Sequence, residues 1–129
     1  MVEDETARLT VLLVDDVDDN RSMLRRMLQV NDCRVVEAVN GQEAVEIARE
    51  KCPDLILMDL NLPQMDGLEA TRLIRECKES CRDIPIVAIT AHDTYGIKEA
   101  ALEVGCNGYL TKPIDFDELE RVLRFFLPE

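Results

Sequence analysis

The chain has little of what a fibrous, membrane or secreted protein needs. Only five glycines and five prolines occur in 129 residues, of which 47% are hydrophobic, so collagen-like and disordered classes are excluded. The longest nearly apolar stretch, residues 84–89, falls far short of the roughly 18 residues of a membrane span. The acidic start MVEDETAR lacks the apolar region of a signal peptide. We therefore expect a folded cytoplasmic protein without membrane association.

Histidine and paired-cysteine motifs are also scarce. The sequence contains one histidine and five cysteines, an odd number with no CxxC pair. A zinc site or a disulfide framework is therefore disfavoured. We expect most of the cysteines to fill small spaces in the core. They are Cys33, Cys52, Cys77, Cys81 and Cys106.

Positive charge is outnumbered throughout the chain. Lys and Arg total 15 against 27 Asp and Glu, which gives a formal net charge of −12, and no dense basic run occurs. Such an acidic chain repels the phosphates of nucleic acids and of anionic membranes. We therefore expect no direct nucleic-acid partner.

Short branched apolar runs alternate with helical patterns along the whole length. Strands are predicted at 10–14, 35–39, 55–58, 86–89 and around Tyr109, and helices at 18–29, 42–51, 68–77, 95–104 and 116–126. Uninterrupted apolar strands between amphipathic helices indicate a parallel sheet covered on both faces. We therefore predict one α/β domain over 1–129, with its core at about 9–127, built as a doubly wound (βα)5 sandwich.

Acidic residues stand where two of these helices should begin. Asp66 precedes the 68–77 pattern and is predicted to be its N-cap. Asp18 and Asp19 are interpreted in the same way, as caps of the first helix.

Polar side chains follow four of the predicted strands directly. Asp15 and Asp16 follow the first strand, Asp59 the third, Thr90 the fourth and Lys112 the fifth. Because chemistry in such folds lies at the carboxyl ends of the strands, we expect these side chains to meet. Three clustered carboxylates repel one another and need protons or a cation, and an all-oxygen set favours Mg²⁺.

A carboxylate beside Mg²⁺, an ammonium and a hydroxyl is suited to phosphoryl transfer onto that carboxylate. Asp59 stands alone at its strand end and is the predicted nucleophile, whereas Asp15 and Asp16 are arranged like ligands. Thr90 and Lys112 could each contact a phosphoryl oxygen. Singly, each residue has an ordinary structural explanation, and only their joint placement indicates the function.

With these residues in view, the sequence resembles the receiver domains of two-component response regulators over about 9–127. The resemblance rests on four fragments: VLLVDD (11–16), LILMDLNLPQMDGLEATRLIR (55–75), IPIVAITA (84–91) and GYLTKP (108–113). It implies the flavodoxin-like strand order 2-1-3-4-5, which is that of the family itself. We expect a standalone regulator, similar to single-domain chemotaxis regulators, rather than a domain of a hybrid kinase.

The resemblance also implies the chemistry of the site. Asp59 would accept a phosphoryl group from the phosphohistidine of a histidine kinase or a histidine phosphotransfer protein. Mg²⁺, or Mn²⁺ in its place, would be held by Asp15, Asp16, Asp59 and the backbone carbonyl of Asn61. The protein would be a phosphoacceptor that assists its own phosphorylation and hydrolysis, rather than a turnover enzyme.

A conformational switch is implied as well. Thr90 and Tyr109 would be the switch pair, and Lys112–Pro113 would be a cis peptide. The 95–104 helix, the Tyr109 strand and the last helix would change together and bind a downstream protein. Phe125 and Phe126 are adjacent, so one of them is expected to point away from the core. Asn61 and His92 would tune the lifetime of the phosphoryl group.

Two other function classes fit less well. A flavodoxin-like flavin binder needs a Ser/Thr/Gly loop after the first strand, where this chain places four aspartates that would repel a flavin phosphate. An aspartate-nucleophile phosphatase would carry a second catalytic aspartate where this chain has Asn61. GxGxxG and GxxxxGK loops are absent, so the sequence gives nucleotide binding no support.

Overall fold

The computed structural model describes residues 9–62, 64–77, 80–91 and 96–127. Within these ranges the elements follow the predicted alternation, with a short 3₁₀ segment, η1, before the fourth strand. They are β1 (Thr10–Val14), α2 (Asp18–Val30), β2 (Arg34–Ala38), α3 (Gly41–Lys51), β3 (Leu55–Asp59), α4 (Gly67–Arg75), η1 (Ser80–Asp83), β4 (Ile86–Thr90), α5 (Ile97–Val104), β5 (Gly108–Thr111) and α6 (Phe116–Phe126).

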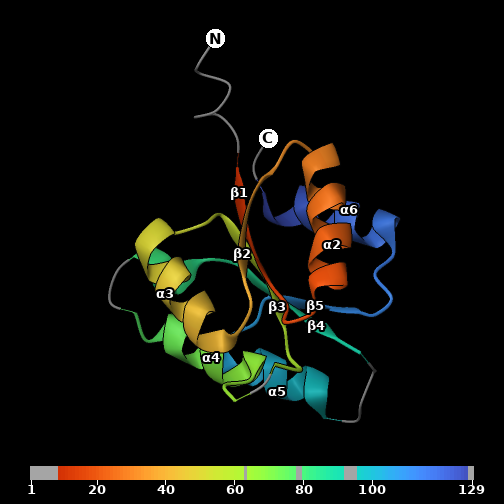
Figure 1. Cartoon of the computed structure of the whole chain (residues 1–129). Coiled ribbons are helices and arrows are strands. Elements are labelled where there is room, and N and C mark those ends of the chain that lie inside the picture. The colour runs from red at the N-terminus through yellow and green to blue at the C-terminus, as the bar shows by residue number, and fades with distance from the viewer. Residues whose placement is uncertain (1–8, 63, 78–79, 92–95, 128–129) are drawn as a thin grey trace.

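The five strands form one sheet in the order β2-β1-β3-β4-β5, and every neighbouring pair is parallel. This confirms the flavodoxin-like strand order. Helices α3, α4 and α5 cover one face of the sheet, while α2 and α6 cover the other (Figure 1). The order along the sheet brings the ends of β1, β3 and β4 side by side at its centre.

Each face of the sheet has its own hydrophobic core. On β1, Leu12 and Val14 belong to the cluster beneath α3, α4 and α5, whereas Val11 and Leu13 belong to the cluster beneath α2 and α6. Successive residues of a strand point to opposite faces, so a strand covered on both sides must be apolar at every position. All five residues of β3 and of β4 are buried, and the first four of each strand are apolar for this reason. The last residues, Asp59 and Thr90, are polar.

The helix starts agree only in part with the predicted caps. Asp66 is the N-cap of α4, where its side chain accepts a hydrogen bond from the Glu69 amide, as predicted. The assignment of Asp18 and Asp19 as caps is wrong, because both lie in the first turn of α2 and the N-cap position is Val17. Here the turn is organised by Asp15, whose Oδ1 accepts a hydrogen bond from the Val17 amide.

Two helix ends also differ from the predicted ranges. Helix α4 ends at Arg75 rather than residue 77. Helix α5 is described from Ile97, after Gly96 at a φ of 85°, and the expected start at residue 95 lies outside the described residues. A positive φ suits glycine and breaks the helical path at that point.

The cysteines depart from the sequence expectation. Cys33 and Cys106 are buried free thiols, which fits core filling, but Cys52 is exposed. Cys77 and Cys81 form a disulfide that the sequence did not suggest. Their Cα atoms lie 6.5 Å apart because α4 ends early and η1 brings the chain back beside it, a return that cysteine spacing alone does not reveal.

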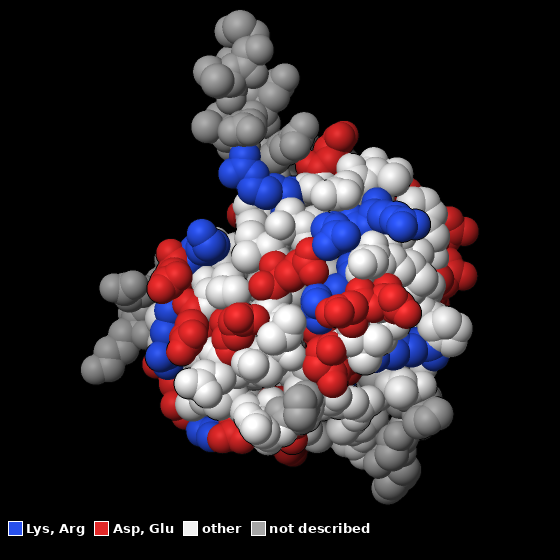
Figure 2. Space-filling model, in the orientation of Figure 1, with Lys and Arg blue, Asp and Glu red and all other residues white. Residues whose placement is uncertain are grey.

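The surface carries charges of both signs, with the acidic ones in excess. On the face shown in Figure 2, Asp and Glu side chains are spread widely, with Lys and Arg in small groups between them. Among the described residues, no helix is both long and apolar enough to cross a bilayer.

Candidate functional site

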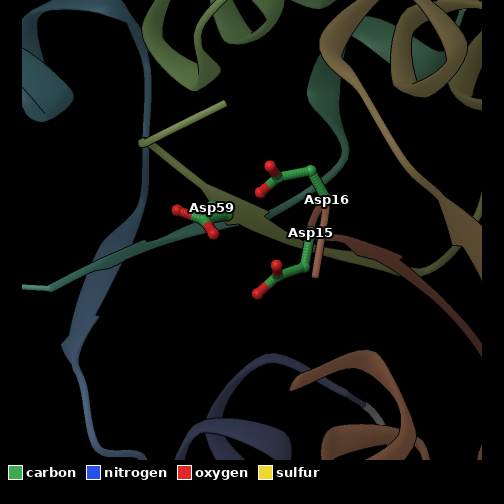
Figure 3. Close-up of side chains that lie close together, drawn as sticks. All are labelled: Asp15, Asp16 and Asp59. Carbon is green, nitrogen blue, oxygen red and sulfur yellow. The ribbon is translucent and has the colours of Figure 1, made fainter. Parts of the chain in front are cut away.

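Three carboxylates meet at the carboxyl ends of the neighbouring strands β1 and β3. Asp15 and Asp16 follow β1, and Asp59 is the last residue of the neighbouring β3 (Figure 3). One carboxylate oxygen from each of the three lies within 4.8 Å of the others. Asp15 and Asp59 are each only 1% exposed, whereas Asp16 is exposed to solvent. Two of the three carboxylates are therefore buried, and the third is open to solvent.

Lys112 reaches this cluster from the end of β5. Its Nζ donates a hydrogen bond to Asp59 Oδ2 at 2.9 Å and lies 3.7 Å from Asp15 Oδ2. Its backbone N–H donates to the Thr90 carbonyl at 2.8 Å, which ties the residue to the end of β4. The peptide bond between Lys112 and Pro113 is cis. The ammonium therefore donates a hydrogen bond to one buried carboxylate and lies within ion-pair distance of a second.

The carboxylate oxygens of the site differ in their hydrogen bonding. Asp59 Oδ1 accepts from the Asn61 amide at 2.8 Å, and Asp15 Oδ1 accepts from the Val17 amide at 2.8 Å. Asp15 Oδ2 is buried and has no hydrogen-bond donor within the described structure. Buried carboxylate oxygens normally have a partner, and a hard cation provides one where no donor does. The all-oxygen donor set therefore fits Mg²⁺ or Mn²⁺.

The charges perturb one another at these distances. Burial, together with the nearby charge of Asp59, raises the pKa of Asp15, although the Val17 hydrogen bond and Lys112 oppose this. Burial alone would lower the pKa of Lys112, but the hydrogen bond and charge of Asp59, with help from Asp15, raise it above its ordinary value. Lys112 therefore stays cationic at neutral pH. Its single positive charge lies beside two buried carboxylates.

The two residues expected to form a switch lie on the side of the sheet covered by α5. Thr90 ends β4 and is 6% exposed. Tyr109 is half-buried on β5 beside Ala88, which shares the face of Thr90 because the two residues are two apart on β4. The ammonium of Lys98 on α5 lies 4.6 Å from the centroid of the Tyr109 ring.

The residues expected to set the phosphoryl lifetime are only partly described. Asn61 lies two residues beyond Asp59, and its side chain is exposed beside the cluster. His92 lies outside the described residues. The structure thus brings together Asp15, Asp16, Asp59 and Lys112.

Two residues that support the site were not identified from the sequence. A Cβ atom on Gly67 would lie 2.4 Å from the Asp59 carbonyl oxygen, so only glycine allows α4 to start against the end of β3. Arg21 on α2 contacts the backbone of Asp15 through its guanidinium. The Asp66-Gly67 pair is a weak sequence signal for the first, and a lone helical arginine gives no signal for the second.

The site and fold have counterparts among known proteins. The family model of the response regulator receiver domain matches residues 11–124. The polar-differentiation response regulator DivK of Brucella anthropi is 35% identical over 118 residues, which cover 92% of this chain and 95% of that relative.

Solved structures give the same result. The receiver domain of the sensor histidine kinase PA1611 from Pseudomonas aeruginosa, with a magnesium ion coordinated in its active-site cleft, is 40% identical. Its TM-score is 0.86, covering 93% of this chain and 98% of that one.

A second solved structure is the receiver domain of Ssk1 from Saccharomyces cerevisiae, crystallised with the histidine phosphotransfer protein Ypd1. It is 35% identical with a TM-score of 0.83, covering 92% of this chain and 88% of that one. From its family match, its relatives and its fold, the chain belongs to the response regulator receiver domains of two-component systems.

Proposed function

We propose that this receiver domain accepts a phosphoryl group on Asp59 from the phosphohistidine of a histidine kinase or a histidine phosphotransfer protein, in a reaction that depends on Mg²⁺ or Mn²⁺. The observation that carries the proposal is the setting of Asp59. Its carboxylate is buried at a strand end, hydrogen-bonded to Lys112, and within reach of the Asp15 and Asp16 carboxylates.

In the proposed reaction, an oxygen of Asp59 attacks phosphorus in line with the departing nitrogen. The O–P bond forms as the P–N bond breaks, and the electron pair of the P–N bond passes to the departing nitrogen. A donor phosphohistidine whose other ring nitrogen carries a proton leaves as neutral imidazole, so no further reactant is needed. Lys112 already donates a hydrogen bond to Asp59 Oδ2. It can donate to a phosphoryl oxygen instead once that group is bound to Asp59. The Thr90 hydroxyl would donate to another oxygen.

The metal would be held by the carboxylates of Asp15, Asp16 and Asp59 and by the backbone carbonyl of Asn61. The buried oxygen of Asp15 that lacks a donor supports this assignment. When bound, the cation supplies positive charge beside the oxygens of the phosphoryl group.

A small cavity beside the site supports delivery by a protein donor. It measures about 230 Å³, and its lining includes Asp15 and Lys112 together with apolar Met23, Leu24 and Ile114. Met23 is 45% exposed on α2. A donor carrying its phosphohistidine on an apolar surface could dock here with the imidazole directed at Asp59.

Receiver domains of this family are phosphoacceptors, and this chain would assist both formation and hydrolysis of its own acyl phosphate. Asn61 would lie beside the attacking water, where its amide can hydrogen-bond the water but cannot act as a base. His92 would lie beside the same water. This residue is outside the described structure.

Intact-mass spectrometry after incubation with acetyl phosphate tests the proposed reaction. We expect a mass gain of one phosphoryl group in the presence of Mg²⁺ and no gain when EDTA removes the metal. Peptide mapping should place the modification at Asp59. A gain that is insensitive to EDTA, or that maps to another residue, would reject the proposal.

Phosphorylation would also remodel the surface formed by α5, β5 and α6. Added charge at Asp59 gives Thr90 and Lys112 a new partner, and a two-state protein shifts only when such contacts differ between its states. Tyr109 would turn inward from its place beside Lys98. Phe125, 81% exposed on α6, and Leu102, 55% exposed on α5, leave apolar area on this surface for a downstream protein.

Amide chemical shifts measured with and without beryllofluoride test this switch. We expect the largest changes in α5, β5 and α6, with Arg34–Ala38 of the distant edge strand β2 as the internal control. Unchanged shifts from Thr90 to Phe126 in a protein saturated with beryllofluoride would refute the switch.

A further inference from the structure

Arg21 joins three parts of the chain around the turn that carries the acidic pair. Its Nη1 donates to the Asp15 carbonyl at 2.9 Å, and its Nε donates to Glu37 Oε1 on β2 at 3.0 Å. Its Nη2 forms an ion pair with Asp18 at the start of α2. The side chain is 13% exposed, so this guanidinium is largely enclosed between α2 and the edge of the sheet.

The contact with Asp15 bears on the orientation of Asp16. The Asp15 carbonyl and the Asp16 amide belong to one planar peptide unit, so holding the carbonyl fixes the plane from which Asp16 departs. The flanking groups are fixed too, since the Asp15 amide donates to the Ala38 carbonyl and the Val17 amide donates to Asp15 Oδ1. Asp16 itself is exposed, so the backbone on either side must set its direction.

A geometric role of Arg21 and a purely electrostatic one predict opposite changes in Mg²⁺ affinity when the residue is removed. Its positive charge is already matched by Asp18 and Glu37. Removing a cation near a cluster of carboxylates would, through charge alone, make the cluster more attractive to Mg²⁺. Loss of the fixed peptide plane would have the opposite effect, because a misdirected carboxylate is a poorer ligand.

We propose that Arg21 is a positioning residue, which holds the turn between β1 and α2 in the shape that presents Asp16 to the metal. This inference rests on the metal site proposed above. A guanidinium is required because its planar fork can donate to a carbonyl and two carboxylates at once, which one ammonium group cannot do in the same geometry.

Calorimetric titration of the purified proteins with MgCl₂ tests the role. We expect Arg21→Ala to bind Mg²⁺ about tenfold more weakly, the usual effect of losing a group that orients a metal ligand. Arg21→Lys retains the charge and should be nearly as weak. Arg25→Ala is the matched control. Arg25 also pairs with Glu37, at 2.6 Å, but within the described part of the chain it makes no hydrogen bond to the acidic turn.

The amide signal of Asp16 provides a second readout that is independent of phosphorylation. It should move in both Arg21 variants without metal and remain in place in Arg25→Ala. If Arg21→Ala does not fold, Glu37→Gln can replace it, since it weakens one anchor of Arg21 and should reduce Mg²⁺ affinity in the same direction.

Three results would overturn the inference. Mg²⁺ affinity that is unchanged or higher in Arg21→Ala would mean that the residue acts only through its charge or not at all. An equal loss in Arg25→Ala would assign the effect to the whole ion-pair cluster rather than to the Asp15 contact. Unchanged Mg²⁺ affinity in Asp16→Asn would show that the proposed metal site itself is wrong. Weaker Mg²⁺ binding in Asp16→Asn, together with normal binding in Arg21→Ala, would reject only the role of Arg21.

Discussion

Asp59→Asn should gain no phosphoryl group from acetyl phosphate in the presence of Mg²⁺, while the unmodified sequence gains one. An amide oxygen is a poor nucleophile, and the substitution also removes one of three clustered carboxylates. The shape of the site should survive, because the asparagine oxygen can still accept a hydrogen bond from the Asn61 amide. Lys112 loses its acceptor on residue 59 but can move to the Asp15 carboxylate, which lies 3.7 Å from its Nζ. The loss is therefore expected to be complete in the phosphorylation assay and small in thermal unfolding.

Asp83→Asn is a suitable control for this experiment. Its carboxylate is 82% exposed at the end of η1 and is remote in the fold from the cluster at the ends of β1 and β3. Asp83→Asn should be phosphorylated at the same rate as the protein without the substitution. A phosphoryl group that appears on Asp59→Asn at the same rate would place the acceptor elsewhere.

The fold could be predicted from the sequence because its main features repeat along the chain. Strands that are covered on both faces are apolar at every position, and the segments LILM (55–58) and IVAI (86–89) have this pattern. The strand order depended on the family resemblance, since periodicity does not distinguish one order of parallel strands from another. Helix starts were less certain because a local aspartate can either cap a helix or pair with a side chain, as Asp18 does with Arg21.

The meeting of Asp15, Asp16, Asp59 and Lys112 was predictable because parallel strands deliver their carboxyl ends to one edge. The surroundings of these residues were not predictable in the same way. Arg21 contacts a backbone carbonyl six residues earlier and Glu37 on another strand, and neither contact leaves a pattern in the sequence. The disulfide between Cys77 and Cys81 likewise depends on where α4 ends.

Asp15→Asn should make the metal-free protein more stable at neutral pH, by roughly 1 kcal/mol in the free energy of unfolding. Asp15 is buried beside Asp59, and its Oδ2 has no donor in the described structure. An asparagine can keep the hydrogen bond from the Val17 amide through its oxygen and place its amino group beside Asp59. The substitution removes the repulsion between Asp15 and Asp59, and it also removes the attraction between Asp15 and the Lys112 ammonium 3.7 Å away. Because the net shift of the Asp15 pKa is upward, we expect the first effect to exceed the second, while Lys112 keeps its bond to Asp59.

The pH dependence of this gain follows from the raised pKa of Asp15, for which burial is the main cause. A folded-state pKa above the unfolded value means that ionised Asp15 destabilises the fold at neutral pH. That cost is relieved as the pH falls through the raised pKa and is gone below the ordinary pKa of an aspartate. The advantage of Asp15→Asn should therefore be largest near pH 7 and shrink as the solution is acidified.

Urea unfolding followed by circular dichroism, without metal and at a series of pH values, measures the effect. Asp16→Asn is the matched control, because it removes one charge from the same turn at an exposed position and should change stability little. Saturating Mg²⁺ should stabilise the unmodified protein more than Asp15→Asn, since a ligand that binds only the folded state adds to its stability. If metal-free Asp15→Asn were less stable than the unmodified protein at pH 7, the Asp15 carboxylate would be favourable in the fold by itself, and its burial would give no support to a metal site.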